Sequence, residues 1–206
     1  FGPKYSEEEM LHDIKKFNFK YEKLESIEKK IATALHEESI VGRFNGSMEW
    51  GPRALGNRSI LATPKNKDIN KILNDRLKRT EFMPFAPIIL SEKSDEYFED
   101  YKTDLKCTEF MTMTLNVKEE KIKLIPAVVH VDNTARPQFV KKEKNESLYN
   151  ILIEYQKLSG IPVLINTSFN LHDEPITCTP HDALRAFQQG AVDFLALGNF
   201  WISKKN

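Results

Sequence analysis

Guanidinium side chains crowd into one turn-rich part of the sequence. Seven of the thirty basic residues are arginine, and five of those seven lie within residues 43–79. The stretch MEWGPRALGNRS (48–59) contains two glycines and a proline and follows neither a strand nor a helix period, so it predicts a bend. A guanidinium binds phosphate or carboxylate through two parallel bonds, which makes Arg53 and Arg58 candidate anion ligands, with Ser59 adding a hydroxyl. Surface salt bridges are the alternative explanation of the cluster.

Two further polar stretches follow segments with the character of strands. HVDNTARPQ (130–138) supplies Arg136, and Lys78 and Arg79 add two charges at the end of a predicted helix. NTSFN (166–170) supplies neutral donors and acceptors suited to a small planar amide or a nucleotide edge: Asn166, Thr167, Ser168 and Asn170. Taken alone, NTSFN also suits an ordinary turn, and Arg136 suits a structural ion pair. Because ligands of α/β folds bind where strands end, we expect these stretches to share a site.

Other kinds of chemistry leave no signature in the sequence. There is no Walker-type loop, no nucleophile–base pair and no metal-ligand spacing among the five histidines and two cysteines, so no metal ligand is predicted. The formal net charge is 0, which argues against strong binding to RNA or a membrane. No apolar run approaches the length of about 18 residues that crosses a membrane. We expect a reduced, cytoplasmic protein, and a chain that begins without methionine suggests a fragment.

The order of predicted elements indicates the fold class. Strands expected at 39–45, 110–117, 126–131 and 161–165 alternate with helices, and a closing strand or hairpin is expected at 191–202. The helices are expected within 67–82, 147–160 and 179–190. This alternation predicts one α/β (α+β) domain over 39–206, with a twisted mixed sheet flanked by helices. Residues 1–38 are expected to form a helical appendage, with one helix opened by a capping box of Ser6 and Glu9 and another over 22–36.

Four segments, in this order, resemble the C-terminal region of the NodU/CmcH/TobZ carbamoyltransferases: MEWGPRALGNRSILATP, MPFAPIIL, HVDNTARPQ and VLINTSFNLHDEPITCTPHDALRAF. The resemblance implies a YrdC-like domain that binds ATP and carbamoyl phosphate, with Mg²⁺ on the phosphates, and forms carbamoyl-adenylate. It also implies an N-terminal ASKHA-type partner domain, absent from this sequence, that passes the carbamoyl group to a hydroxyl acceptor. Full activity is then expected to need that domain.

The resemblance also assigns roles to residues. It places Arg53, Arg58 and Arg79 on the phosphates with Lys78 and Arg136 in support, and Ser168 and Asn170 match the Ser-x-Asn element of YrdC-like proteins. The segment with the Lys-x-Arg element is incomplete, since Leu77 stands in place of its lysine and Met83 in place of a later arginine. Ser47 replaces a third basic residue of the family, directly before Met48 and Glu49. The alternatives are a non-catalytic nucleotide- or RNA-binding module of the same fold, and a structural half that only docks its partner domain.

Overall fold

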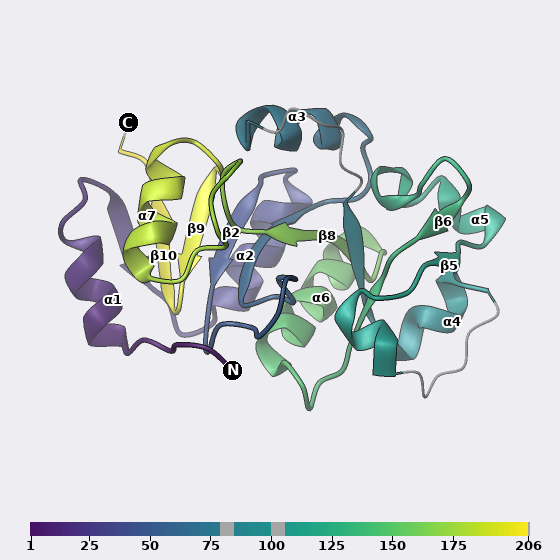
Figure 1. The fold of residues 1–206 in the computed structure, drawn as a ribbon, viewed down its shortest axis with the longest axis horizontal. Helices are drawn as coiled ribbons and strands as arrows, with labels where there is room; N and C mark the ends of the chain where they lie inside the picture. Colours follow the sequence, from purple (N-terminus) through teal and green to yellow (C-terminus); the bar gives the residue numbers. More distant parts are fainter. Residues whose placement is uncertain (79–84, 100–105, 206) are drawn as a thin grey trace.

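A mixed sheet runs through the whole molecule. The structure, a computed structural model, describes residues 1–78, 85–99 and 106–205 (Figure 1). Its 8-stranded sheet has the order β1-β10-β9-β2-β3-β8-β4-β7. The strands are β1 (Lys20–Lys23), β2 (Val41–Phe44), β3 (Arg58–Ala62), β4 (Ala86–Leu90), β7 (Gln138–Val140), β8 (Val163–Ser168), β9 (Phe194–Leu197) and β10 (Phe200–Ser203). The pairs β2–β9 and β4–β7 are parallel and the others antiparallel, so the predicted mixed α/β sheet is confirmed.

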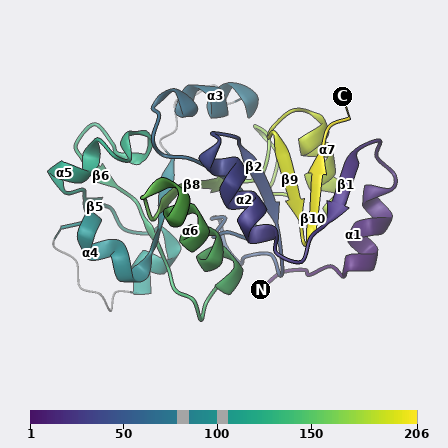
Figure 2. The same cartoon turned by 180° about the vertical axis from the view of Figure 1, so that it is seen from behind.

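Helices cover both faces of this sheet. Helices α1 (Glu7–Ile14) and α7 (Pro180–Gln188) lie on one face, and α2 (Ile27–His36) and α6 (Glu146–Ser159) pack together on the other (Figures 1 and 2). Helix α3 (Asp68–Arg76) lies across the ends of the strands. A smaller unit contains α4 (Ser94–Tyr97), α5 (Glu119–Ile122) and a pair of short strands, β5 (Leu115–Asn116) and β6 (Thr134–Ala135).

Local signals explain where the main helices begin and end. The capping box of Ser6 and Glu9 opens α1 as expected. Thr179 caps α7 with Pro180 in its first turn, and α6 ends at Gly160, whose φ of +76° suits a residue without Cβ.

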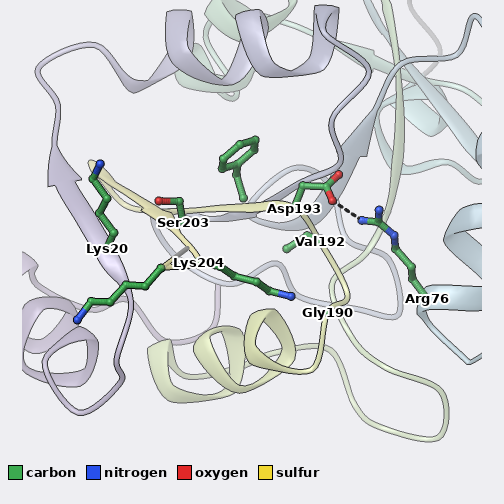
Figure 3. Close-up of a pocket in the computed structure, with 9 residues that line it drawn as sticks. Lys20, Arg76, Gly190, Val192, Asp193, Ser203 and Lys204 are labelled. Carbon is green, nitrogen blue, oxygen red and sulfur yellow. Dashed lines mark hydrogen bonds and ion pairs between the residues drawn. The ribbon is translucent and has the colours of Figure 1, made fainter.

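The first 38 residues take part in the sheet and its packing. The predicted helix over 22–36 begins only at Ile27, because Lys20–Lys23 pair as an edge strand with β10, Lys20 lying opposite Ser203 (Figure 3). Strand β1 thus adds a third strand to the hairpin of β9 and β10. A domain boundary at residue 38 stays a prediction.

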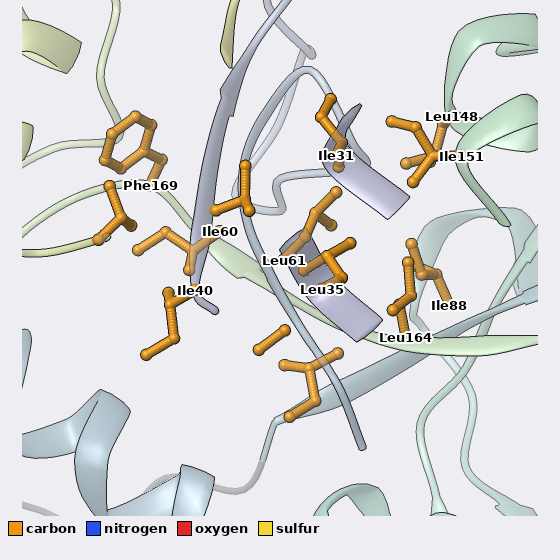
Figure 4. Packing of buried hydrophobic residues seen from close by; sticks show 14 of the residues in the cluster. Ile31, Leu35, Ile40, Ile60, Leu61, Ile88, Leu148, Ile151, Leu164 and Phe169 are labelled. Atoms are coloured by element: carbon orange, nitrogen blue, oxygen red, sulfur yellow. The ribbon is translucent and has the colours of Figure 1, made fainter. Parts of the chain in front are cut away.

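The core lies on both faces of β3. Leu61 faces the layer of α2 and α6, where it meets Leu35, whereas Ile60 faces the opposite layer beside Phe169 (Figure 4). Both side chains are fully buried. Alternate residues of one strand therefore enter two separate layers, which is why the strand is apolar without interruption after Arg58 and Ser59.

Two predicted strands are wrong. Residues 106–110 form a 3₁₀ helix, Met111 has a φ of +54°, and within 110–117 only β5 is a strand. It pairs with the equally short β6, and Val117 adds a single bridge to Phe98. The apolar run at 126–131 instead begins as a 3₁₀ turn over Pro126–Val128, which buries Ala127 and Val128 without strand pairing. Apolar alternation reports burial here, and pairing depends on distant segments.

Candidate functional site

Two buried arginines hold the loop that joins β2 to β3. Arg58, at the start of β3, has no exposed surface. Its guanidinium donates to the carbonyls of Asn45 and Asn57 at 2.9 Å and to that of Pro3 at 3.2 Å. Its guanidinium carbon lies 3.6 Å from the centroid of the Phe44 ring. Arg58 therefore holds the backbone of the bend from the buried side.

Arg43 supports the same loop from β2. Arg43 is 2% exposed, and its guanidinium donates to the carbonyl of Gly56 and to Oδ1 of Asn57. Burial lowers the pKa of Arg43 to about 10, and the nearby carboxylate of Glu49 opposes that shift. Oε1 of Glu49 in turn accepts from the backbone N–H groups of Leu55 at 2.8 Å and Asn57 at 2.5 Å. Charged side chains thus replace the hydrogen bonds that this irregular loop cannot make with itself.

The loop forms one wall of a small cavity with a volume of about 270 Å³. Five predicted site residues line it, from three separate segments: Arg53, Arg136, Asn166, Thr167 and Ser168. The remaining lining residues are Pro52, Ala54, Phe85, Ala86 and Met111. The ends of neighbouring strands meet here because β8 lies between β3 and β4. The structure thus brings together one member or more of each polar stretch that the sequence singled out.

Two like charges share this cavity. Burial lowers the pKa of Arg136, and the positive charge of Arg53 lowers it further. Within the part of the chain that the structure describes, neither guanidinium has an ion-pair partner. A bound anion would relieve both the desolvation and the repulsion, so the electrostatics favour a phosphate or carboxylate ligand.

Other predicted site residues lie outside the cavity lining. Ser59 is buried beneath the loop, where its Oγ accepts from the N–H of Gly56 at 2.9 Å. Lys78 is exposed after α3, with a φ of +57°. Nδ2 of Asn170 donates to the carbonyls of Leu171 and Glu174. Arg79, like Met83, falls outside the described residues.

Three residues that shape the site are not among those predicted from the sequence. Arg43 is a lone charge inside the apolar run SIVGRFN, a pattern typical of a buried ion. Glu49 directly follows Met48 in the quoted bend, and Gln138 ends the quoted stretch HVDNTARPQ. Their hydrogen bonds join loop to strand across long sequence separations, so no local pattern reveals them.

A larger cavity lies at the other end of the sheet. It measures about 840 Å³ and is lined by Lys20 of β1, by the end of β10 with Lys204 after it, by the turn between α7 and β9, and by Arg76 of α3 (Figure 3). Its arginine, Arg76, already pairs with Asp193 at 2.7 Å. None of the site residues predicted from the sequence lines this larger cavity, whereas five of them line the smaller one. We therefore place the candidate site at the smaller cavity.

Two further kinds of site concern metal ions and membranes. Among the described residues, no group of three or more His, Cys, Asp or Glu side chains is placed to hold a metal ion. No helix within the same residues has the length and apolar character needed to cross a bilayer.

Comparison with known families then decides the assignment. The sequence model of the carbamoyltransferase C-terminus matches residues 32–204. The chain belongs to this family. The resemblance of its motifs to the NodU/CmcH/TobZ carbamoyltransferases is thereby confirmed. The cavity described above lies wholly within the matched region of this carbamoyltransferase C-terminal domain.

Similar curated proteins are much longer than this chain. The domain is 43% identical to the uncharacterized protein MJ1051 of Methanocaldococcus jannaschii, over 96% of this chain and 37% of that protein. It is 38% identical to nodulation protein NolNO of Sinorhizobium fredii, over 89% of this chain and 27% of that protein. The carbamoyltransferase domain spans about a third of the length of three of the curated relatives that it matches.

Solved structures share the fold at low identity. Full-length HypF, in a phosphate- and nucleotide-bound form, matches 90% of this chain with a TM-score of 0.56 and 17% identity, over 22% of that chain. P. abyssi Sua5, complexed with L-threonine, matches 86% with a TM-score of 0.57 and 14% identity, over 48% of that chain. The carbamoyltransferase domain is thus YrdC-like in fold, as predicted.

Proposed function

We propose that this domain binds ATP and carbamoyl phosphate and forms carbamoyl-adenylate for a hydroxyl acceptor. The observation that carries the proposal is the pair of guanidinium groups, Arg53 and Arg136, in one cavity with no ion-pair partner among the described residues. Transfer to the acceptor would require the N-terminal ASKHA-type domain of a full-length protein. Membership of the family and the proposed substrates, ATP and carbamoyl phosphate, fit a cytoplasmic location.

The proposed reaction asks the protein mainly for charge and orientation. Water releases phosphate from carbamoyl phosphate and leaves carbamate. An oxygen of carbamate then attacks the α-phosphorus of ATP, and pyrophosphate leaves with the electron pair of the broken P–O bond. The second step brings the carbamate anion against the phosphates of ATP, so cations held in a partly dry cavity would lower their repulsion.

The cavity residues divide these tasks. Arg53 and Arg136 would hold phosphate oxygens, while Thr167 and Ser168 would offer hydroxyls and Asn166 an amide at the end of β8. Mg²⁺ would arrive on the nucleotide and screen its phosphates. Lys78, Arg79 and Asn170 would contribute to the nucleotide side of the site. Arg58 and Ser59 would act through the loop whose backbone they hold.

The test follows both products in one reaction. The chain is incubated with Mg²⁺, ATP and carbamoyl phosphate, and phosphate, pyrophosphate and adenylate are measured. We expect pyrophosphate release that needs both substrates and falls about a hundredfold in Arg53→Ala and Ser168→Ala. Arg76→Ala is the matched control, since it removes an arginine from the other cavity.

Two outcomes would count against the proposal. Turnover that survives both cavity variants would place the chemistry elsewhere. A folded wild-type chain that binds neither ATP nor a carbamoyl phosphate analogue would leave docking to the N-terminal domain as the better account.

A further inference from the structure

Positive charge gathers in the larger cavity, at the end of the sheet away from the candidate site. Three lysines line it: Lys20 on the edge strand β1, and Lys204 and Lys205 directly after β10. All three are exposed, so a small solute reaches them from the solvent. Lys205 donates to Oδ1 of Asn18 at 2.5 Å, whereas neither Lys20 nor Lys204 has a carboxylate partner among the described residues.

The carboxylate in this cavity does not balance these lysines. Among the described lining residues, Asp193 alone carries one. Its Oδ1 accepts from Arg76 at 2.7 Å, as Figure 3 shows, and its Oδ2 accepts from the main-chain N–H of Ile40 at 2.8 Å. Arg76 and Asp193 thus cancel each other's charge. The ammonium groups of Lys20 and Lys204 remain, and a hollow surface concentrates the field with which they attract an anion.

The other charged residues of β1 show the usual pairing. Lys23 pairs with Glu7 of α1 at 2.7 Å, and Glu22 pairs with Lys30 of α2 at 3.6 Å. Within the part of the chain that the structure describes, Lys20 is therefore the charged residue of this strand that no opposite charge matches. It is also the residue of β1 that lines the cavity.

The two unmatched ammonium groups belong to different sides of the cavity. Nζ of Lys204 lies 3.9 Å from the position of a Cβ built on Gly190, in the turn that follows α7. Lys20 lies on the opposite side from Gly190, and Ser203 lies between them (Figure 3). Ser203 adds a hydroxyl to the lining. Two cations with a hydroxyl between them suit a ligand that carries a negative charge at each end.

We propose that the larger cavity binds a small organic anion with two or more negatively charged groups, which are phosphates or carboxylates. Lys20 holds one group and Lys204 another, each through a charge-assisted hydrogen bond. Val192 and Phe194 also line the cavity and offer an apolar surface to the carbon skeleton between the charged groups. This site is separate from the smaller cavity and needs none of the chemistry proposed there.

Trp201 reports on binding at this site. The sequence has two tryptophans, and the other, Trp50, lies in the loop of the candidate site. In a Trp50→Phe chain the remaining indole is that of Trp201, which stacks on the ring of Phe194 with centroids 4.9 Å apart. Citrate and fructose 1,6-bisphosphate are the probes, because one carries carboxylates and the other phosphates. We expect a saturable change in Trp201 emission, and the probe that binds more tightly by calorimetry identifies the preferred group.

Charge-removing variants locate the binding. Lys20→Gln combined with Lys204→Gln should weaken the better probe about tenfold or more, because two charge-assisted bonds are lost. Lys29→Gln combined with Lys67→Gln is the matched control, since it removes the same charge from exposed lysines outside the cavity. It should change the affinity by less than about twofold. Phosphonoacetamide, a stable analogue of carbamoyl phosphate with one anionic group, tests the smaller cavity, and both double variants should bind it alike.

The outcomes separate the two cavities. Binding of neither citrate nor fructose 1,6-bisphosphate by the folded chain would overturn this proposal. An affinity that survives the loss of Lys20 and Lys204, or falls equally in the control, would overturn it too, since net charge would then explain the binding. Failure to bind phosphonoacetamide, with the Trp201 response intact, would count against the proposed function and leave the second site standing.

Discussion

The main-chain carbonyl of Gly56 accepts a hydrogen bond from the buried guanidinium of Arg43. The N–H of the same glycine donates to Oγ of Ser59. Gly56 has a φ of +119°, and a Cβ built on it would lie 2.5 Å from Cδ2 of Leu148 in α6. The bend is therefore fastened at one residue to both flanking strands and to the helix layer.

Gly56→Ala should destabilise the domain by about 2–4 kcal/mol, because strained backbone and a steric clash add together. Chemical denaturation of the purified variant measures it. Gly51→Ala is the matched control, since Gly51 has a similar φ of +112° and nothing within 4 Å of the added Cβ. We expect about 1 kcal/mol there, from the backbone alone. Equal losses of unfolding free energy in the two variants would show that the side chain of Leu148 moves away from the added Cβ without strain.

Arg58→Met should cost about 3 kcal/mol of the free energy of unfolding. The variant keeps the apolar stem but leaves the carbonyls of Asn45, Asn57 and Pro3 without their donor. Arg53→Met, five residues earlier and exposed, should change the free energy of unfolding by less than about 0.5 kcal/mol. Urea unfolding of both variants gives the comparison. A small loss in Arg58→Met would contradict the supporting role of its guanidinium.

The fold was readable where its signals are local. The capping boxes of α1 and α7 and the glycine after α6 each lie within a few residues of the end that they mark. The failures at 110–117 and 126–131 share a cause, since a strand needs a partner and the partner is set by the rest of the chain. The opposite error occurs at Lys20–Lys23, where no strand was predicted. This polar segment is a strand because it pairs with β10.

The site was readable in part for a similar reason. Because ligands of α/β folds bind at strand ends, a shared site for Arg53, Arg136 and Asn166 could be predicted, and all three line one cavity. It could not separate Arg53 from Arg58, which lie in the same bend. Arg58 turns inward because it is the first residue of β3 and pairs with Phe44, and that register is a property of the sheet. Gln138 bonds to Asn166 and to the carbonyl of Leu55, both distant in the sequence, so no local pattern marks it.

The hydroxyl of Tyr97 should lose its proton at a higher pH than an ordinary tyrosine. Burial raises the pKa of its hydroxyl from 10.0 to about 12, with the neighbouring Glu96 adding to the shift. Between those values the unfolded chain loses this proton and the folded chain keeps it, so its contribution to stability is full below pH 10.0 and is lost as the pH rises through 12. Near-ultraviolet absorbance of wild type minus Tyr97→Phe should show one tyrosinate appearing near pH 12. A difference that titrates like free tyrosine would mean that water reaches the hydroxyl.

Arg53 and Arg136 should respond to mutation in the opposite sense from Arg58. Each lies near the other's charge without an ion-pair partner among the described residues, so the empty site carries a repulsion that one replacement removes. Arg53→Gln and Arg136→Gln should therefore leave the free energy of unfolding unchanged or slightly raised. Each should weaken phosphonoacetamide binding about tenfold or more, because a charge-assisted bond to phosphate is lost.

A double-mutant cycle then asks whether the two guanidinium groups hold the same anion. If they do, the double variant should lose less affinity than the two single losses combined, because either replacement already breaks the shared grip on the phosphate. Calorimetry at two salt concentrations adds a second measure, since each lost cation should make binding less sensitive to salt. If Arg53→Gln instead lowers stability as Arg58→Met does, Arg53 belongs to the support of the loop, and the cavity retains one cation for its anion.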